Sequence, residues 1–208
     1  MTAASYDTNV FLNCPFDEAY EPLLEATLFT VFFCGFRPRC ALEIHDSGSP
    51  RIEKIADMIC ECRLAIHDIS RTDLDPLNHL PRFNMPFELG LFLGAQRYGT
   101  GSHKRKRCLI LDIERYRYQK FLSDIAGQDP SDYQPLQPDS LIRRIRDWLK
   151  THDTRHLPGA VVIQARFAKF QTDKSAICDG LQLSAQHLTY VDLVEVIRQW
   201  ITMPEPIA

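Results

Sequence analysis

Two acidic residues, Asp68 and Glu88, are the strongest candidates for chemistry in this chain of 208 residues. Asp68 follows the run Leu-Ala-Ile-His, and Glu88 is the only charged side chain between Arg82 and Arg97. Two carboxylates in one crevice suit sugar chemistry, because one can stabilise or attack an oxocarbenium-like ribose carbon while the other orients hydroxyls or water. The pair therefore indicates a reaction at a glycosidic bond, if the fold brings the two side chains together.

Both carboxylates also have a structural interpretation, which the sequence leaves open. The stretch from Asn84 predicts a helix with Pro86 in its first turn, where a missing N–H costs nothing. Glu88 would then be a first-turn charge that the helix dipole stabilises. Asp68 would be a turn cap just after a strand.

Residues in the neighbouring loops suit the binding of a nucleotide. Helix N-termini that meet in a crevice favour a phosphate, and Arg71 or Arg82 would add positive charge. The alternatives are a helix cap for Asn13, a core position for Phe16 and a surface loop for Arg82. Cys14 lies in the right loop for a nucleophile, but spacing identifies no histidine partner. The expected substrate-binding residues are Asn13, Phe16, Ser70, Arg71, Arg82 and Asn84.

Strands and helices alternate strictly between residues 10 and 112. The predicted strands are apolar runs, which indicates burial on both faces, as in a parallel sheet covered by helices. We therefore predict a flavodoxin-like α/β fold for residues 1–125, followed by a mainly helical C-terminal segment, residues 126–208. The predicted strands are 10–13, 36–43, 64–68 and 107–112, and the predicted helices are 18–33, 51–62 and 84–98.

The C-terminal segment is less regular. Amphipathic periodicity predicts helices at 139–152 and 190–202, while 114–127 is a weaker helical candidate. Residues 128–139 have the composition of a loop, and 161–183 are ambiguous. The segment either packs on the sheet domain or forms an interface with a partner.

Topology predicts where a site would lie. In an open parallel sheet, ligands bind beyond the carboxyl ends of the strands where the strand order reverses, between the first and third strands in flavodoxin-like order. The loops after residues 10–13 and 64–68 meet there, together with the start of the helix at 84–98. Asp68 and Glu88 are therefore expected on one rim.

Composition limits the class of protein. A hydrophobic content of 45%, a charged content of 25% and a net charge of −3 are ordinary for a globular domain and give no reason to expect nucleic-acid binding. The basic run at residues 103–107 is expected to be a solvated connection, with binding of phosphate or an acidic partner as the alternative. Gly90 and Gly94 are expected to allow close helix–sheet packing.

Cysteine usage and hydropathy indicate a compartment. The first eight residues are short and polar, so no secretory signal is expected, and no apolar stretch is long enough to span a bilayer. The seven cysteines are odd in number and lie mostly in apolar runs, which favours reduced thiols in a cytoplasmic protein. Neither cysteine nor histidine spacing indicates a metal site.

The stretch Arg-Phe-Asn-Met-Pro-Phe-Glu-Leu-Gly-Leu-Phe-Leu-Gly at residues 82–94 resembles the signature of bacterial TIR-like, predicted nucleotide-binding domains. These domains occur as effectors of antiviral defence, and residues 48–55 also resemble their helix start. A more distant similarity is to nucleoside 2-deoxyribosyltransferases. Their first strand ends in a loop similar to Asn-Cys-Pro-Phe at residues 13–16, an Asp follows the third strand, and a Glu starts the next helix.

The resemblance implies a flavodoxin-like domain that cleaves an N-glycosidic bond. Glu88 matches the catalytic Glu of both families, and Asp68 matches the deoxyribosyltransferase residue that orients substrate. Asn13 and Phe16 match the base-side loop of that family only approximately. The similarity covers residues 9–112, and it departs from TIR domains in the Asn-Cys-Pro-Phe loop and in the long loop at 69–82.

Three functions follow from these observations. The first is an N-glycosidase that cleaves the base–ribose bond of NAD or a related nucleotide, with the nucleotide as substrate and no bound cofactor. The second is a non-catalytic nucleotide-binding sensor or scaffold, and the third is a deoxyribosyltransferase or hydrolase acting on nucleosides or nucleotides. The TIR-like resemblance implies a homo-oligomer or an activating protein partner, without membrane or nucleic acid, and the C-terminal helices are the candidate interface.

Overall fold

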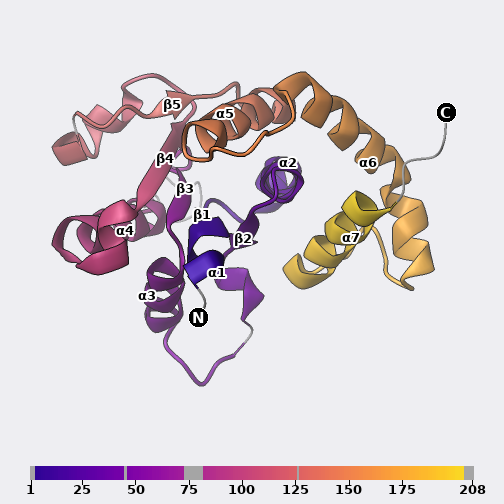
Figure 1. Ribbon diagram of the computed structural model, residues 1–208, viewed down its shortest axis with the longest axis horizontal. Helices are drawn as coiled ribbons and strands as arrows, with labels where there is room; N and C mark the ends of the chain where they lie inside the picture. The colour runs from indigo at the N-terminus through magenta and orange to yellow at the C-terminus, as the bar shows by residue number, and fades with distance from the viewer. Residues whose placement is uncertain (1–2, 45, 73–81, 126, 204–208) are drawn as a thin grey trace.

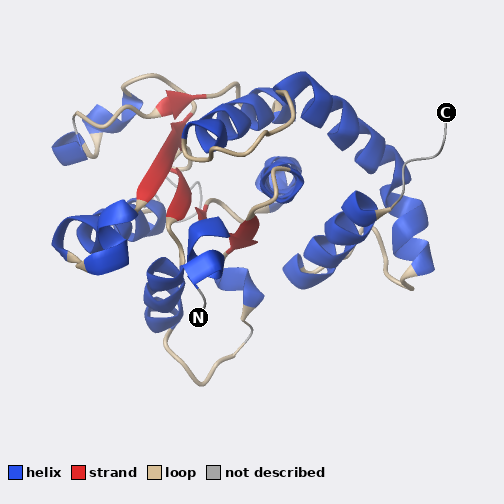
Figure 2. Ribbon diagram, in the orientation of Figure 1, coloured by secondary structure: helices blue, strands red, loops and turns tan. Residues whose placement is uncertain are grey.

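Five parallel strands form one sheet in the order β2-β1-β3-β4-β5. The computed structural model describes residues 3–44, 46–72, 82–125 and 127–203. Helices cover both faces of the sheet (Figures 1 and 2), so the predicted flavodoxin-like α/β class is confirmed. The strands are β1 (Asn9–Asn13), β2 (Arg37–Arg39), β3 (Leu64–Asp68), β4 (Arg107–Asp112) and β5 (Ser131–Asp132).

The helices divide into two layers (Figure 1). α3 (Arg51–Glu61) and α4 (Asn84–Tyr98) pack together on one face, and α2 (Glu21–Phe33) and α5 (Pro138–Thr151) pack together on the other. α6 (Ala160–Gly180) and α7 (Tyr190–Thr202) extend the second layer beyond α2. The shorter helices are α1 (Ala3–Thr8), η1 (Glu18–Tyr20), η2 (Ala41–Glu43), η3 (Gly101–Arg105), η4 (Arg117–Lys120) and η5 (Ser123–Ile125).

Successive residues of the central strands point to opposite faces of the sheet. In β1, Val10 and Leu12 join the hydrophobic cluster formed with α2 and α5, whereas Phe11 joins the cluster formed with α3 and α4. In β3, Ile66 belongs to the first cluster and Ala65 to the second. This parity decides which face each polar residue at the strand ends will occupy.

Most predicted elements have the predicted bounds. β3, β4, α4 and α7 coincide with the predicted ranges, and the ambiguous residues 161–183 are mainly the helix α6. The second strand is only three residues long and has Pro38 at its middle, as an edge strand allows. The predicted helix at 18–33 is divided into η1 and α2, with Pro22 in the first turn of α2.

Two predictions about residues 114–139 were wrong. The weak helical candidate at 114–127 contains the short helices η4 and η5 rather than an α-helix, and the predicted loop at 128–139 contains β5. The sheet therefore extends past residue 125, where the sequence suggested a division.

The C-terminal helices are joined to the sheet layer by a buried aromatic and polar contact. The Phe29 ring of α2 lies 5.4 Å from the Phe170 ring of α6 and 5.5 Å from the Trp200 ring of α7. Glu25, buried in α2, forms an ion pair with Lys174 of α6. Such burial favours one continuous core rather than a loosely attached segment.

The basic run at 103–107 lies at the amino ends of the strands, where the helices end. Lys106 is fully buried, and its ammonium group donates to two carbonyls at the end of α3. Lys104 donates to the carbonyl of Arg97 in the last turn of α4, at 2.5 Å. Cations are favourable at helix C-termini. The run is therefore a set of helix caps as much as a connection, and the expectation of a solvated segment was wrong for Lys106.

No helix in the described part of the chain is long and apolar enough to cross a membrane.

Candidate functional site

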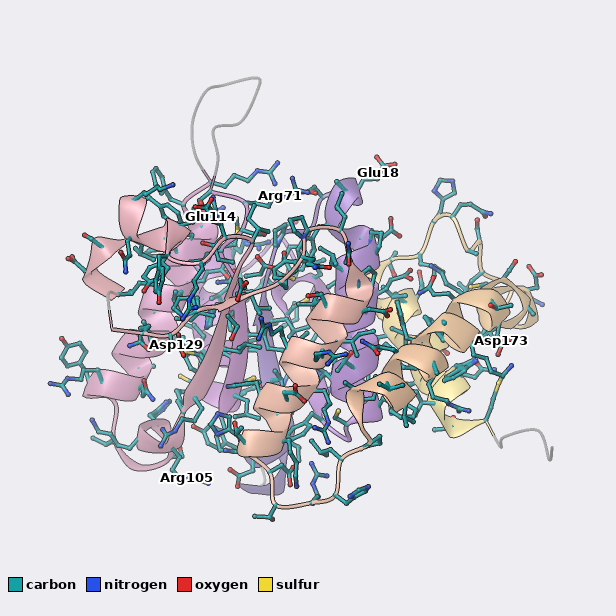
Figure 3. All side chains as sticks on the ribbon, turned by 90° about the horizontal axis from the view of Figure 1, so that it is seen from above. Glu18, Arg71, Arg105, Glu114, Asp129 and Asp173 are labelled. Carbon is teal, nitrogen blue, oxygen red and sulfur yellow. The ribbon has the colours of Figure 1, made fainter. Side chains whose placement is uncertain are left out.

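A cavity of about 520 Å³ lies beyond the carboxyl end of β1, between the loop that follows this strand and the start of α4. This is the predicted position, because the strand order reverses between β1 and β3. Figure 3 shows Glu18, Arg71 and Glu114 near this end of the sheet, and Arg105 at the opposite end. The residues that line the cavity are Asn13, Cys14, Pro15, Phe16, Asp17, Arg51, Arg82, Asn84, Met85 and Glu88.

Glu88 lies in the second turn of α4, which begins at Asn84 as predicted. The expectation that Glu88 is a first-turn charge was therefore wrong. Its carboxylate makes no hydrogen bond to any residue that the structure describes. The residue is only 7% exposed. Burial raises the pKa of Glu88 to about 6, against an opposing effect of Arg51. A carboxylate held in a cavity without hydrogen bonds is costly, which favours a functional role.

Asn13 holds the start of α4 in place. Its side-chain Nδ2 donates to the carbonyl of Met85 at 2.8 Å and lies 2.9 Å from Nδ1 of His67, its neighbour across β1 and β3. Burial lowers the pKa of His67 to about 3, so the ring is neutral and its Nδ1 can accept from Asn13. Asn13 lines the cavity as predicted, but its amide protons are already used, one by Met85 in the Glu88 helix and the other by His67.

Asp68 lies on the opposite face of the sheet from Asn13. It has the same parity in β3 as Ile66, so its side chain points toward α2 and α5. Asp68 is fully buried and accepts from the hydroxyls of Tyr20 at 2.6 Å and Tyr133 at 2.8 Å. Burial raises the pKa of Asp68, and these hydrogen bonds oppose the rise.

Asp68 is not among the described residues that line the Glu88 cavity. The two carboxylates therefore share one end of the sheet, as topology predicted, but they occupy different sides of it.

Ser70 extends the Asp68 network. Its N–H donates to Asp68 at 2.8 Å, and its carbonyl accepts from Arg117 at 2.8 Å. Arg117 also forms a buried ion pair with Asp112, 2.6 Å long. Ser70 is buried and is not among the described cavity residues, so these contacts support the fold rather than a substrate.

Positive charge gathers at the rim of the cavity. Arg82 and Arg51 line it, and Arg82 pairs with Asp17 at 3.1 Å. Arg71 reaches the same aspartate at 3.6 Å but is not among the described lining residues. Asn84 lines the cavity from the first position of α4.

Sequence reasoning missed Arg51. The residue is exposed at the first position of α3, directly after Pro50. Within the described residues, no side chain caps the N-terminus of α3 or of α4, so both ends can present free N–H groups. The available signal was topological, because the start of the helix after the second strand also reaches the carboxyl end of the sheet.

Phe16 and Cys14 differ in their suitability for chemistry. Phe16 is 36% exposed on the cavity wall, so the alternative that it packs in the core was wrong. Cys14 is buried, and burial raises the pKa of its thiol, with Cys40, Asp68 and Glu88 adding to the rise. A thiol in that environment is a poor nucleophile.

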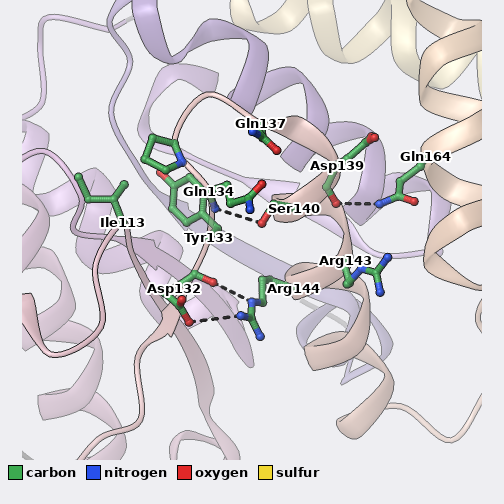
Figure 4. Close-up of a pocket in the computed structure, with 11 residues that line it drawn as sticks. Ile113, Asp132, Tyr133, Gln134, Gln137, Asp139, Ser140, Arg143, Arg144 and Gln164 are labelled. Carbon is green, nitrogen blue, oxygen red and sulfur yellow. Dashed lines mark hydrogen bonds and ion pairs between the residues drawn. The ribbon is translucent and has the colours of Figure 1, made fainter.

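A larger cavity, of about 660 Å³, lies between β5 and the start of α5 (Figure 4). Arg144 there pairs with Asp132 at 3.2 Å, and Gln164 donates to the carbonyl of Asp139 at 2.9 Å. Both acidic residues are exposed, unlike Glu88. This cavity has no buried carboxylate among its described lining residues and is the weaker candidate.

Residues 73–81 of the predicted long loop lie outside the described residues. Among the residues that are described, no group of three His, Cys, Asp or Glu side chains is arranged to hold a metal ion. No protein-family model, curated protein or solved structure matches this chain.

Proposed function

We propose that the cavity beside Glu88 cleaves the N-glycosidic bond between the base and the ribose of NAD or a related nucleotide. The observation that carries this proposal is Glu88 itself, a buried carboxylate without a hydrogen bond to the described residues, in a cavity whose rim carries Arg51 and Arg82. The resemblance of residues 82–94 to TIR-like effectors supports the same reaction.

Glu88 would act on the ribose carbon that bears the base. As the C1′–N bond breaks, its electron pair leaves with the base and positive charge develops on C1′ and the ring oxygen. Glu88 is ionised above about pH 6 and would stabilise that charge or bond to C1′. Water then adds to C1′ and releases its proton to solvent; where Glu88 has bonded to C1′, that bond breaks in the same step and its electron pair returns to the carboxylate.

The surroundings of Glu88 favour a cationic leaving group. Of the other acidic side chains in the described lining, Asp17 is engaged by Arg82, and burial raises the pKa of the Cys14 thiol well above its usual range, so neither is placed to protonate a leaving base. Nicotinamide attached to ribose is a pyridinium, which takes the bond electrons and leaves as a neutral molecule without a proton. Neutral purines and pyrimidines leave more readily when protonated. The cavity therefore suits NAD better than ordinary nucleotides.

The rest of the substrate would contact the rim. Arg51, Arg82 and the free N–H groups at the starts of α3 and α4 suit the phosphates. Phe16 exposes a ring on which a base can stack, a contact worth about 1–3 kcal/mol per base in other proteins. We further propose that the protein acts in the cytoplasm as an effector of bacterial antiviral defence, assembled with its own copies or with an activating protein.

The second candidate is a non-catalytic nucleotide sensor. It is favoured by the position of Asp68, because the expected pair of carboxylates is divided between two faces of the sheet. The same position weakens the deoxyribosyltransferase alternative, since Asp68 is engaged by Tyr20 and Tyr133 rather than held ready to orient a sugar.

Time-resolved mass spectrometry tests the proposal. Wild type and Glu88→Gln are incubated with NAD, NADP and a panel of nucleotides and deoxynucleotides, at low and high protein concentration. Glu195→Gln, an exposed change on α7, is the control. Release of nicotinamide or a base by wild type and the control, but not by Glu88→Gln, supports a glycosidase. Retention of a ligand without turnover in every condition supports the sensor.

A further inference from the structure

The outer face of α4 is exposed and mainly aromatic, with the charge of Arg97 near its C-terminal end. Phe83, which precedes the helix, is 61% exposed, and Phe87 and Tyr98 are 57% and 85% exposed. Together with Gly90 and Gly94 these residues recur at helical spacing along one side of α4. Surface helices ordinarily carry polar residues on their outer side, and clustered exposed apolar residues mark interaction sites.

The two glycines of this face have no role inside the chain. A methyl group placed at Gly90 or Gly94 meets no atom within 4 Å, so the expectation that they allow close helix–sheet packing was wrong. Glycine is among the poorest helix formers. Its use twice on an exposed helix leaves a shallow gap between Phe87 and Tyr98, open to a partner.

We propose that this face, Phe83 to Tyr98 on the outside of α4, is the interface between two copies of the chain. In an antiparallel pairing about a twofold axis, Phe87 of one copy meets Gly90 of the other, and Phe83 meets Gly94. Both pairs share one midpoint, between residues 88 and 89, as a self-complementary interface requires. The rings of Phe83 and Phe87 then each fill a gap that the partner's glycines leave.

The exposed rings supply about half of the area that a standard dimer interface buries per partner. At roughly 200 Å² per fully exposed aromatic side chain, the three rings offer roughly 400 Å² per copy, about half of the ~800 Å² per partner in a standard interface. Pro86, Leu91 and Leu93, which are partly exposed on the flanks of the same face, extend it. The large exposed apolar residues of α6 and α7 are instead valines, Val161, Val162 and Val191, and none of them is aromatic.

This interface is independent of the proposed reaction. Glu88 lies on the buried side of α4, and α4 lies across the sheet from α6 and α7 (Figure 1). The oligomer contact would therefore lie on α4 rather than on the C-terminal helices, where the sequence suggested it, and dimerisation can be measured without any substrate.

Sedimentation velocity over a range of concentrations tests the interface in the full chain. Wild type is expected to dimerise, and Phe87→Ser and Gly90→Gln are each expected to weaken dimerisation at least tenfold. Val161→Ser and Val191→Ser are matched controls that should leave it unchanged. Since Gly90 has open space within the chain, Gly90→Gln should keep or raise the melting temperature of the monomer. A wild type that stays monomeric, or a dimer lost only in the valine variants, overturns the proposal.

Disulfide trapping tests the pairing itself. Cys60 is the exposed cysteine among the seven, so Cys60→Ser provides the background. Phe87→Cys and Gly90→Cys are made in separate chains, mixed and oxidised. A cross-linked heterodimer formed faster than either homodimer is expected, whereas equal rates for all three products contradict the antiparallel register.

Discussion

Two carboxylates at the same end of the sheet have opposite surroundings. Asp68 accepts hydrogen bonds from Tyr20, Tyr133 and the N–H of Ser70. Glu88 has no hydrogen bond to a described residue and faces a cavity. Burial raises the pKa of both, but only at Asp68 do hydrogen bonds compensate.

The difference separates a buried carboxylate that supports the fold, Asp68, from one that is available for function, Glu88. A buried charge with full hydrogen bonding holds its neighbours in one arrangement, so its loss harms the fold. A buried charge without hydrogen bonds costs stability and is retained only if it does something else. The two sides of the sheet should therefore respond in opposite ways to removal of the charge.

The largest effect is expected from Glu88→Gln on turnover. Loss of the charge that stabilises the developing ribosyl cation should lower kcat by about 10²–10³-fold or more, as removal of one electrostatic group does in other enzymes. Nicotinamide release, measured beside wild type under identical conditions, checks this result. Turnover that survives in Glu88→Gln would remove the carboxylate from the mechanism.

Asp68→Asn should have the largest effect on stability. The amide cannot accept from both tyrosine hydroxyls and the Ser70 N–H as the carboxylate does, so the free energy of unfolding should fall by about 2–3 kcal/mol. Urea denaturation of Asp68→Asn and of Tyr133→Phe measures the change. If Asp68→Asn kept wild-type stability yet lost activity, Asp68 would belong to the site after all.

The sequence predicted at which end of the sheet a residue lies better than it predicted on which face. Uniformly apolar strands reveal burial on both sides, but they carry no alternation that would say where a given residue points. Asp68 and Glu88 could thus be placed at one end from topology alone. Their separation depends on the parity of β3 and on the helices α2 and α4 lying on opposite faces at the reversal point.

The missed residues are those whose roles arise from contacts distant in the chain. His67 appears in the sequence as an isolated histidine, and only its pairing with Asn13 across β1 and β3 shows that it supports α4. Arg51 is far from Glu88 in sequence, and the second βα connection brings it to the cavity. By contrast, the start of α4 at Asn84 depends on neighbouring residues in the sequence, and it was predicted correctly.

Asn13→Ala should have an intermediate effect on both properties. It leaves the buried carbonyl of Met85 and Nδ1 of His67 without their donor, which should cost about 1–3 kcal/mol of stability. Because the start of α4 also positions Glu88, kcat should fall more than the affinity for NAD. A variant that changes only affinity would instead indicate direct contact between Asn13 and the base.

A smaller effect is expected on the pH dependence of stability, and the raised pKa of Glu88 determines its direction. The pKa of Glu88 is raised from 4.5 to about 6 on folding, so the folded state binds more protons between these values. Stability should therefore fall as the pH rises from about 4.5 to 6, and wild type should be less stable than Glu88→Gln by about 1 kcal/mol above pH 6. Urea denaturation of both proteins at pH 4.5 and 7.5 measures the difference, and equal stabilities at pH 7.5 would mean that Glu88 carries no uncompensated cost.

Arg51→Gln should have the smallest effect, a shift in the pH midpoint of kcat/KM, and this shift tests directly whether Arg51 acts on Glu88 in the cavity. Arg51 lowers the pKa of Glu88 against the effect of burial, so its removal should move the midpoint of kcat/KM against pH upward from about 6. The same change should raise KM for NAD if the guanidinium contacts a phosphate. Arg71→Gln is the matched control, because Arg71 pairs with Asp17 at the rim but is not itself among the described lining residues, so its removal should leave the midpoint unchanged. Equal shifts in both variants would mean that general surface charge, rather than Arg51 in the cavity, sets the ionisation of Glu88.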